Sequence, residues 1–139
     1  MDLSETAVAR ALKLAKRDNF ELKAVVQDIG SMEMKPESYT LVIISNVLNF
    51  FHEQDIQKLV EKVKKSLQKG GFIYINAFDE REQRTGEKNR NFHYFTKKEL
   101  LSYFVDYQTI SLSQTYALDL SHGRPHYHHT IELLTQKTH

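Results

Sequence analysis

Residues 41–78, LVIISNVLNFFHEQDIQKLVEKVKKSLQKGGFIYINAF, are the stretch that decides the fold. The stretch opens with a continuous apolar run at 41–45, which is typical of a strand buried on both faces of a parallel sheet. Apolar residues then recur at helical spacing over 53–68 and predict an amphipathic helix. The glycine pair at 70–71 suits the left-handed turn that ends a helix, and the run 72–78 predicts another strand. The stretch therefore predicts a strand–helix–strand unit.

The flanking sequence extends this unit in both directions. The same patterns predict helices over residues 4–17 and from Thr96 onward, and strands over residues 22–27, 107–117 and 127–136. Either Asp2 or Ser4 can cap the first of these helices. Alternating elements followed by a terminal strand pair predict one α/β domain over residues 1–139, with a mostly parallel sheet and antiparallel C-terminal edge strands.

Composition excludes several classes of protein. The net charge of +1 offers no electrostatic case for binding nucleic acid. The absence of cysteine excludes disulfides, thiolate zinc sites and cysteine nucleophiles. No apolar run approaches the roughly 20 residues that span a bilayer, and the N-terminus lacks the pattern of a signal peptide. We therefore expect a cytoplasmic protein that binds neither nucleic acid nor membrane.

Polar side chains fall at the carboxyl ends of the predicted strands, where ligands of open parallel sheets bind. They are Asp2, Asp28 and the Ser45-Asn46 pair. One carboxylate can accept both hydroxyls of a ribose, and another can accept from an adenine amino group. Asp2 as a helix cap and Asp28 as a turn former explain the same residues equally well. The sequence by itself leaves both interpretations open.

Four segments occur in the order seen in class I S-adenosylmethionine-dependent methyltransferases, and the chain resembles that family. The segments are DLSETA at 2–7, QDI at 27–29, SYTLVIIS at 38–45 and LQKGGF at 67–72. The segment YFTKKEL at 94–100 and the histidine-containing C-terminal hairpin are most similar to the tellurite-resistance TehB-like branch. The resemblance implies an incomplete Rossmann-like methyltransferase fold. It also implies an S-adenosylmethionine-dependent enzyme that methylates a small molecule and is linked to tellurite resistance.

The resemblance also implies roles for individual residues. Asp2 corresponds to the acid that binds the ribose hydroxyls of S-adenosylmethionine, and Asp28 to the residue that faces the adenine amino group. The implied cofactor contacts are Asp2, Leu3, Asp28, Ile29, Ser45 and Asn46. The implied substrate-side residues are His93, Tyr94 and His126. No catalytic residue is assigned, although His93 could act as a general base or be an ordinary loop histidine.

The glycine-rich first motif of the family has no counterpart in this sequence. All five glycines lie elsewhere, at positions 30, 70, 71, 86 and 123. Because that motif lets the backbone approach the cofactor, the isolated chain is expected to bind S-adenosylmethionine weakly or not at all, which leaves enzymatic activity open. The alternative is a non-catalytic remnant that acts as a homodimer, since a missing strand would expose a sheet edge.

Histidines gather near the C-terminus, at positions 122, 126, 128 and 129. On a strand, His126 and His128 point to the same face, and such a pair can bind zinc, copper or nickel. Asp119 is the one acidic residue nearby. We assign no metal site, and three interpretations remain: polar residues of a hairpin, substrate-side residues, or a small histidine-based metal-binding protein.

Overall fold

The computed structural model describes residues 1–82, 92–120 and 123–139. The described chain forms two compact units, Met1–Met34 and Lys35–His139, and each is considered by itself. His122 of the histidine cluster lies outside the described residues. Among the described residues, no helix is both long enough and apolar enough to cross a membrane.

The first unit consists of a helix and an extended segment. Helix α1 spans Glu5–Arg17, close to its predicted range, and Ser4 caps it by accepting from the Ala7 N–H at 3.2 Å. Asp2 is not the cap; its Oδ1 instead accepts from the Ser4 N–H at 2.8 Å. The predicted strand at 22–27 is reduced to one parallel bridge between Asp2 and Val26. Apart from this bridge, the described residues of the first unit include no strand that pairs with residues 22–27.

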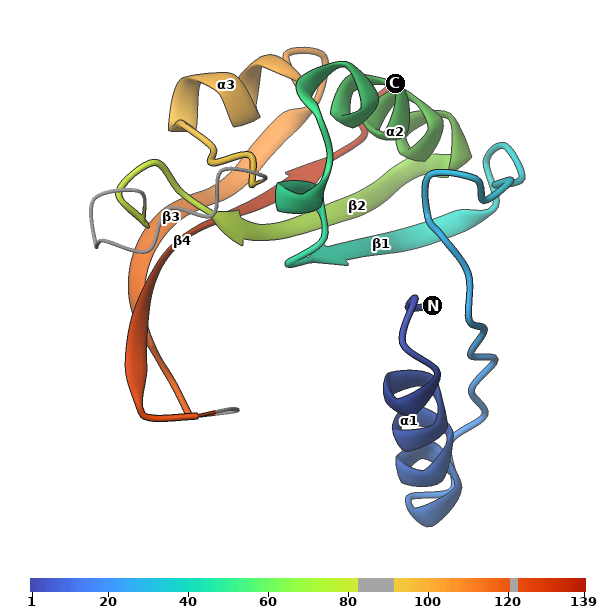
Figure 1. Cartoon of the computed structure of the whole chain (residues 1–139). Coiled ribbons are helices and arrows are strands. Elements are labelled where there is room, and N and C mark those ends of the chain that lie inside the picture. Colours follow the sequence, from blue (N-terminus) through green and yellow to red (C-terminus); the bar gives the residue numbers. More distant parts are fainter. Residues whose placement is uncertain (83–91, 121–122) are drawn as a thin grey trace. The chain divides into compact units, whose positions relative to one another are not determined.

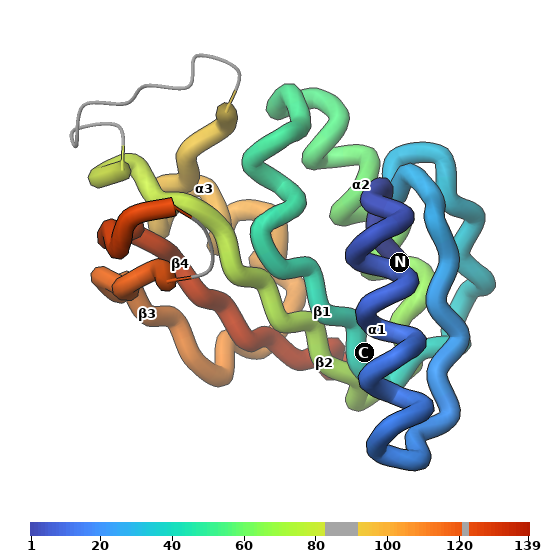
Figure 2. Tube along the Cα trace, turned by 60° about the horizontal axis from the view of Figure 1, so that its bottom comes forward, coloured from blue at the N-terminus to red at the C-terminus, as the bar shows by residue number. Residues whose placement is uncertain are grey.

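The second unit is a four-stranded sheet in the order β1-β2-β4-β3, which Figures 1 and 2 show from two sides. Its strands are β1 Tyr39–Ser45, β2 Leu67–Phe78, β3 Gln108–Asp119 and β4 His126–Gln136. Its helices are η1 Leu48–Phe50, α2 Glu53–Ser66 and α3 Lys97–Ser102. The β1–β2 pair is parallel, whereas β2–β4 and β3–β4 are antiparallel. The α/β class and the antiparallel C-terminal strands are thus confirmed, and the described sheet is mixed, with fewer parallel pairings than predicted.

The core of the second unit lies between the sheet and the helices α2 and α3, which cover one face (Figure 1). The buried apolar side chains of α2 are Ile56, Leu59, Val60 and Val63, and those of the sheet include Ile44, Ile73, Ile75, Ile131 and Leu133. Burial of each such side chain stabilises the fold by about 1.5–3 kcal/mol. The prediction that β1 is buried on both faces is wrong for this unit. Leu41 and Ile43 remain 49% and 62% exposed, because the helices of the unit cover only the opposite face.

The junction between α2 and β2 differs from the glycine cap that the sequence predicts. Helix α2 ends at Ser66, and Leu67 is already extended, with φ −82° and ψ 135°. Gly70 and Gly71 lie inside β2 instead. A Cβ at Gly71 would stand 2.9 Å from both the Gln68 carbonyl oxygen and the Leu67 Cγ. The glycine at 71 therefore permits close packing where the strand begins, rather than ending the helix.

Candidate functional site

A pocket of about 810 Å³ opens in the second unit, where β1 and β2 end and where the β3–β4 hairpin turns. This volume lies within the roughly 300–1,000 Å³ typical of small-molecule sites. Its lining residues are Asn46, Phe50, Asn76, Phe78, Glu82, Phe92, Tyr94, Ala117, Leu118, Asp119, His126, His128, Thr130 and Glu132. A second depression lies over the polar face of α2 and is lined only by glutamine, lysine and glutamate. The strand-end pocket is therefore the better candidate site.

Three of the residues to which the family resemblance implies cofactor or substrate roles line this pocket: Asn46, Tyr94 and His126. Ser45 is exposed at the end of β1 and does not line it. His93 does not line it either, because its Nε2 lies 2.5 Å from Glu99 Oε1 and its ring packs edge-on against Phe95. This pairing joins His93 to α3 and favours a structural role for its ring.

Asn46 reaches the pocket because the chain turns sharply where β1 ends. Its φ is +53°, a left-handed conformation in which asparagine is enriched among non-glycine residues. Its N–H donates to the Asn76 carbonyl oxygen at 2.8 Å, which ties the turn to β2. The turn thus places Asn46 at the carboxyl end of the sheet, as the sequence predicts.

Asn49 holds the pocket together and was not identified from the sequence. Its fully buried side chain donates from Nδ2 to the carbonyl oxygens of Phe78 (3.2 Å) and His93 (2.5 Å). Its Oδ1 accepts from the Phe78 N–H at 2.9 Å, and its own carbonyl accepts from the His93 N–H at 2.8 Å. The amide thereby clamps the segment that precedes α3 against the end of β2. Nothing in the sequence indicated this role, because the partners of Asn49 are distant from it along the chain.

One wall of the pocket is aromatic. The Phe92 ring lies 4.7 Å from Phe50 in an edge-on arrangement and 6.1 Å from Phe78 in a stacked one. Phe78 also contacts the His128 ring, at 4.9 Å. Such pairs contribute about 0.5–1.5 kcal/mol each beyond the area they bury. The wall therefore offers a ligand an apolar surface.

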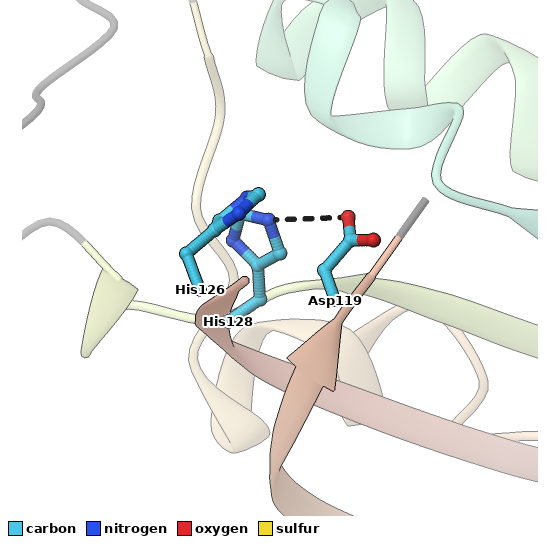
Figure 3. A group of neighbouring side chains, drawn as sticks. All are labelled: Asp119, His126 and His128. Atoms are coloured by element: carbon cyan, nitrogen blue, oxygen red, sulfur yellow. Dashed lines mark ion pairs between the residues drawn. The ribbon is translucent and has the colours of Figure 1, made fainter. Parts of the chain in front are cut away.

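Another part of the lining carries carboxylates and imidazoles, and Figure 3 shows three of these side chains, Asp119, His126 and His128. His128 Nδ1 lies 2.6 Å from Glu82 Oε1, while Glu82 Oε2 accepts from the His129 N–H at 2.6 Å. Glu132 accepts from the Asn76 amide at 3.4 Å. Burial, reinforced by the Glu132 carboxylate, raises the pKa of nearby Tyr74. Glu82 carried no signal in the sequence, because its partners lie more than forty positions away.

The residues expected to hold a nucleoside lie in the first unit. Asp2 forms a parallel bridge with Val26, which lies two residues before Asp28. Each carboxylate uses Oδ1 to accept from a backbone N–H two residues on, in Ser4 and Gly30 respectively. A carboxylate has two acceptor oxygens, so these local turns and a nucleoside contact are compatible. Leu3 is 71% exposed beside Asp2, and Ile29 is half-buried beside Asp28.

Solved structures of methyltransferases share this fold. TehB from Haemophilus influenzae superposes with a TM-score of 0.79 over 97% of this chain, at 16% sequence identity. The N-methyltransferase NodS from Bradyrhizobium japonicum, solved with S-adenosyl-L-homocysteine, gives 0.72 over 99% of this chain at 13% identity. A SAM-dependent methyltransferase from Methanosarcina mazei gives 0.72 over 99%, also at 13% identity. These likenesses confirm the Rossmann-like methyltransferase fold.

The chain spans about half the length of TehB (48%), 65% of NodS and 80% of the Methanosarcina protein. No curated protein sequence matches it. The sequence pattern of a family described as a methyltransferase domain matches residues 1–71. Because that match covers half of the 139 residues, this chain belongs to the methyltransferase domain family.

Proposed function

We propose that the chain acts as an S-adenosylmethionine-dependent methyltransferase with a small-molecule acceptor, and that the strand-end pocket receives the acceptor. The pocket carries this proposal, because it lies at the carboxyl ends of the strands in a methyltransferase domain. Its size suits a small molecule, and its aromatic wall offers such a molecule apolar contacts. The enzyme is expected to work in the cytoplasm.

The residues of the first unit fit the adenosine half of S-adenosylmethionine. Asp2 would accept from the ribose hydroxyls and Asp28 from the adenine amino group, with Leu3 and Ile29 as apolar neighbours of the nucleoside. The cofactor supplies an electrophilic methyl group on a sulfonium. The protein's task is then to align donor and acceptor in a dry site, which needs no dedicated acid or base. Ser45 and Asn46 would lie on the side of the methionine end.

Calorimetric titration with S-adenosylhomocysteine tests this assignment. We expect weak binding by the wild-type chain and a further loss of about 10- to 100-fold in affinity for Asp28→Ala, as for a hydrogen bond to a charged group. Glu21→Ala, which removes an exposed acid of the same unit, is the matched control and should bind like wild type. Absence of binding at millimolar ligand, or equal binding by Asp28→Ala, would contradict the proposal.

The finer assignment is to the TehB-like branch, with tellurite as the acceptor. The fold similarity to TehB supports it, as do the histidines on the hairpin and Tyr94 in the pocket. Transfer of a labelled methyl group from S-adenosylmethionine to tellurite is the direct measurement. We expect label in a tellurium product with wild type and much less with His126→Ala. If wild type and His126→Ala transferred equal amounts of labelled methyl, His126 would not contribute to the acceptor site.

A second candidate function is association into a homodimer. In the described sheet β1 pairs on one side only, and it carries the exposed side chains Leu41 and Ile43. Unpaired strand edges with apolar side chains favour pairing with another chain. Light scattering at micromolar concentration should give the mass of a dimer for wild type and of a monomer for Ile43→Lys. The control variant Val105→Lys changes a residue that is 84% exposed and lies outside β1, so this variant should still form a dimer. A monomeric wild type would contradict the homodimer proposal.

A further inference from the structure

Three potential metal ligands converge on the β3–β4 hairpin, at the wall of the pocket (Figure 3). They are Asp119, His126 and His128, and their ligand atoms all lie within 4.8 Å of one another. Asp119 stands directly opposite His126 in the register of the two strands, and Ala117 stands opposite His128. Ligands on paired strands are held more firmly than ligands on loops. The group is therefore fixed by the ladder itself.

The hydrogen bonds of the two imidazoles select the nitrogen that faces a ligand. His126 Nδ1 lies 2.8 Å from the Arg124 carbonyl oxygen, and His128 Nδ1 lies 2.6 Å from Glu82 Oε1. Both partners can only accept, so each Nδ1 carries a hydrogen and donates it. In the neutral ring the lone pair then resides on Nε2. Metal-binding histidines are oriented in this way, with the second ring nitrogen donating to a carbonyl or a carboxylate.

The charges of the group also suit a cation. Asp119 and Glu82 are both only slightly exposed, with side-chain exposures of 23% and 13%. Asp119 Oδ2 lies 3.7 Å from His128 Nε2, too far for a hydrogen bond but close enough to share an ion. With both imidazoles neutral, the group carries two negative charges, which a divalent ion would offset.

We propose that Asp119, His126 and His128 bind a divalent transition-metal ion such as Zn²⁺, and that Glu82 is a positioning residue acting through His128. Two imidazoles and one carboxylate match the donor preference of this class, whereas Ca²⁺ takes six to eight oxygen ligands. Three protein ligands leave a fourth position, and these residues line the pocket. Zinc binding does not require the proposed methyl transfer, although His126 also lines the proposed acceptor pocket. A bound ion would present that fourth position to a lone-pair donor in the pocket.

Zinc affinity of the full chain, prepared without a histidine tag, tests the proposal by competition with a chromophoric chelator. Wild type should bind one Zn²⁺. His126→Ala, His128→Ala and Asp119→Asn should each weaken binding by more than the roughly 10- to 100-fold that loss of an orienting partner costs. Glu82→Ala should fall within that range, and Glu82→Gln, which keeps an acceptor for Nδ1–H, should recover most of the loss. His52→Ala and His139→Ala, at exposed positions, should bind like wild type.

A measurement on the unaltered chain covers the case in which a variant does not fold. Added Co²⁺ should shift or broaden the amide resonances of Tyr127 and His128 before those of His52 and His139, and it should give the visible absorption of four-coordinate Co²⁺. The proposal is overturned if wild type binds no stoichiometric Zn²⁺. It is equally overturned if the His126→Ala/His128→Ala double variant keeps wild-type affinity, or if Co²⁺ acts first at His52 or His139.

Discussion

At the scale of single residues, Asn49 shows how one side chain organises the pocket. Its amide satisfies three backbone groups of two segments that the sequence separates, and it does so without any exposure to water. A buried polar group with every partner in place rigidifies its surroundings, and the same group becomes costly when a partner is lost. The walls of the pocket therefore depend on a residue that does not line it.

Replacing Asn49 by leucine keeps a similar volume but removes the donors and the acceptor. The Phe78 N–H and the His93 carbonyl would then lose their Asn49 partners, at about 1–3 kcal/mol for each group left unpaired, whereas the Phe78 carbonyl would still accept from the Phe95 N–H at 3.1 Å. We expect the free energy of unfolding in urea to fall by at least the cost of one such group. Gln54→Leu, on the exposed face of α2, is the control and should change it by no more than about 0.5 kcal/mol. A similarly small effect at Asn49 would show that the clamp is unimportant.

Tyr107 gives the molecule a dependence on high pH. Burial, together with the Asp106 and Glu61 carboxylates, raises the pKa of its phenol from 10.0 to about 12. The unfolded chain therefore releases this proton first as the pH rises, so stability should fall between pH 10 and pH 12. Tyr107→Phe removes the titrating group and should reduce the slope of unfolding free energy against pH in that window. An unchanged slope would contradict the assignment, and absorbance titration of the tyrosines gives the pKa directly.

At the scale of elements, local sequence patterns predicted those helix boundaries that depend on residues close together in the sequence. The range of α2 follows from its apolar spacing, and the start of α3 from Thr96, whose hydroxyl accepts from the Glu99 N–H at 3.0 Å. The role of Gly71 could not be predicted in this way. A Cβ at this position would stand 3.1 Å from the Thr40 carbonyl oxygen of a neighbouring strand, and no local pattern contains that contact.

A change at Gly71 tests the close packing at the start of β2. Gly71→Ala would place a Cβ 2.9 Å from a backbone oxygen, and overpacking of this kind costs about 1–3 kcal/mol. Gly70→Asn is the neighbouring comparison, because nothing lies within 4 Å of a Cβ there and asparagine tolerates its positive φ. We expect thermal unfolding to show a much larger loss for Gly71→Ala. Equal losses would contradict the conclusion that lack of space selects glycine at position 71.

At the scale of the whole molecule, the sequence predicted the fold class because alternation of helix and strand is visible without coordinates. Strand ends and the family resemblance indicated Asn46, Tyr94 and His126, which line the pocket, and their roles in binding stay predictions. Glu82 and Asn49 escaped prediction, since their partners are distant in the sequence. Glu82 contacts His128 of β4, whereas Asn49 contacts Phe78 at the end of β2 and the backbone of His93.

The order of the strands predicts how stability is distributed. Strands β2 and β4 each pair on both sides, whereas β1 and β3 are outer strands of the described sheet. In the first unit, Val8 is the one buried apolar residue among those described. Amide hydrogen exchange should therefore be slowest in β2 and β4 and fastest in residues 1–34, since protection follows buried contacts and internal hydrogen bonds. Slower exchange in α1 than in β4 would refute this order.

The same strand order has a kinetic consequence. Strands β3 and β4 are neighbours along the chain and can form a hairpin within microseconds, as can the helical turns of α2. Pairing of β2 with β4 joins residues as distant as Phe72 and Gln136, so a long loop must close. The chain loses conformational entropy in this step before the contacts between the two strands stabilise it. Docking of the hairpin onto β2 should therefore limit the rate of folding. Until it happens, the edges of β2 and β4 stand open together, and this is the interval in which chaperones would protect the chain most.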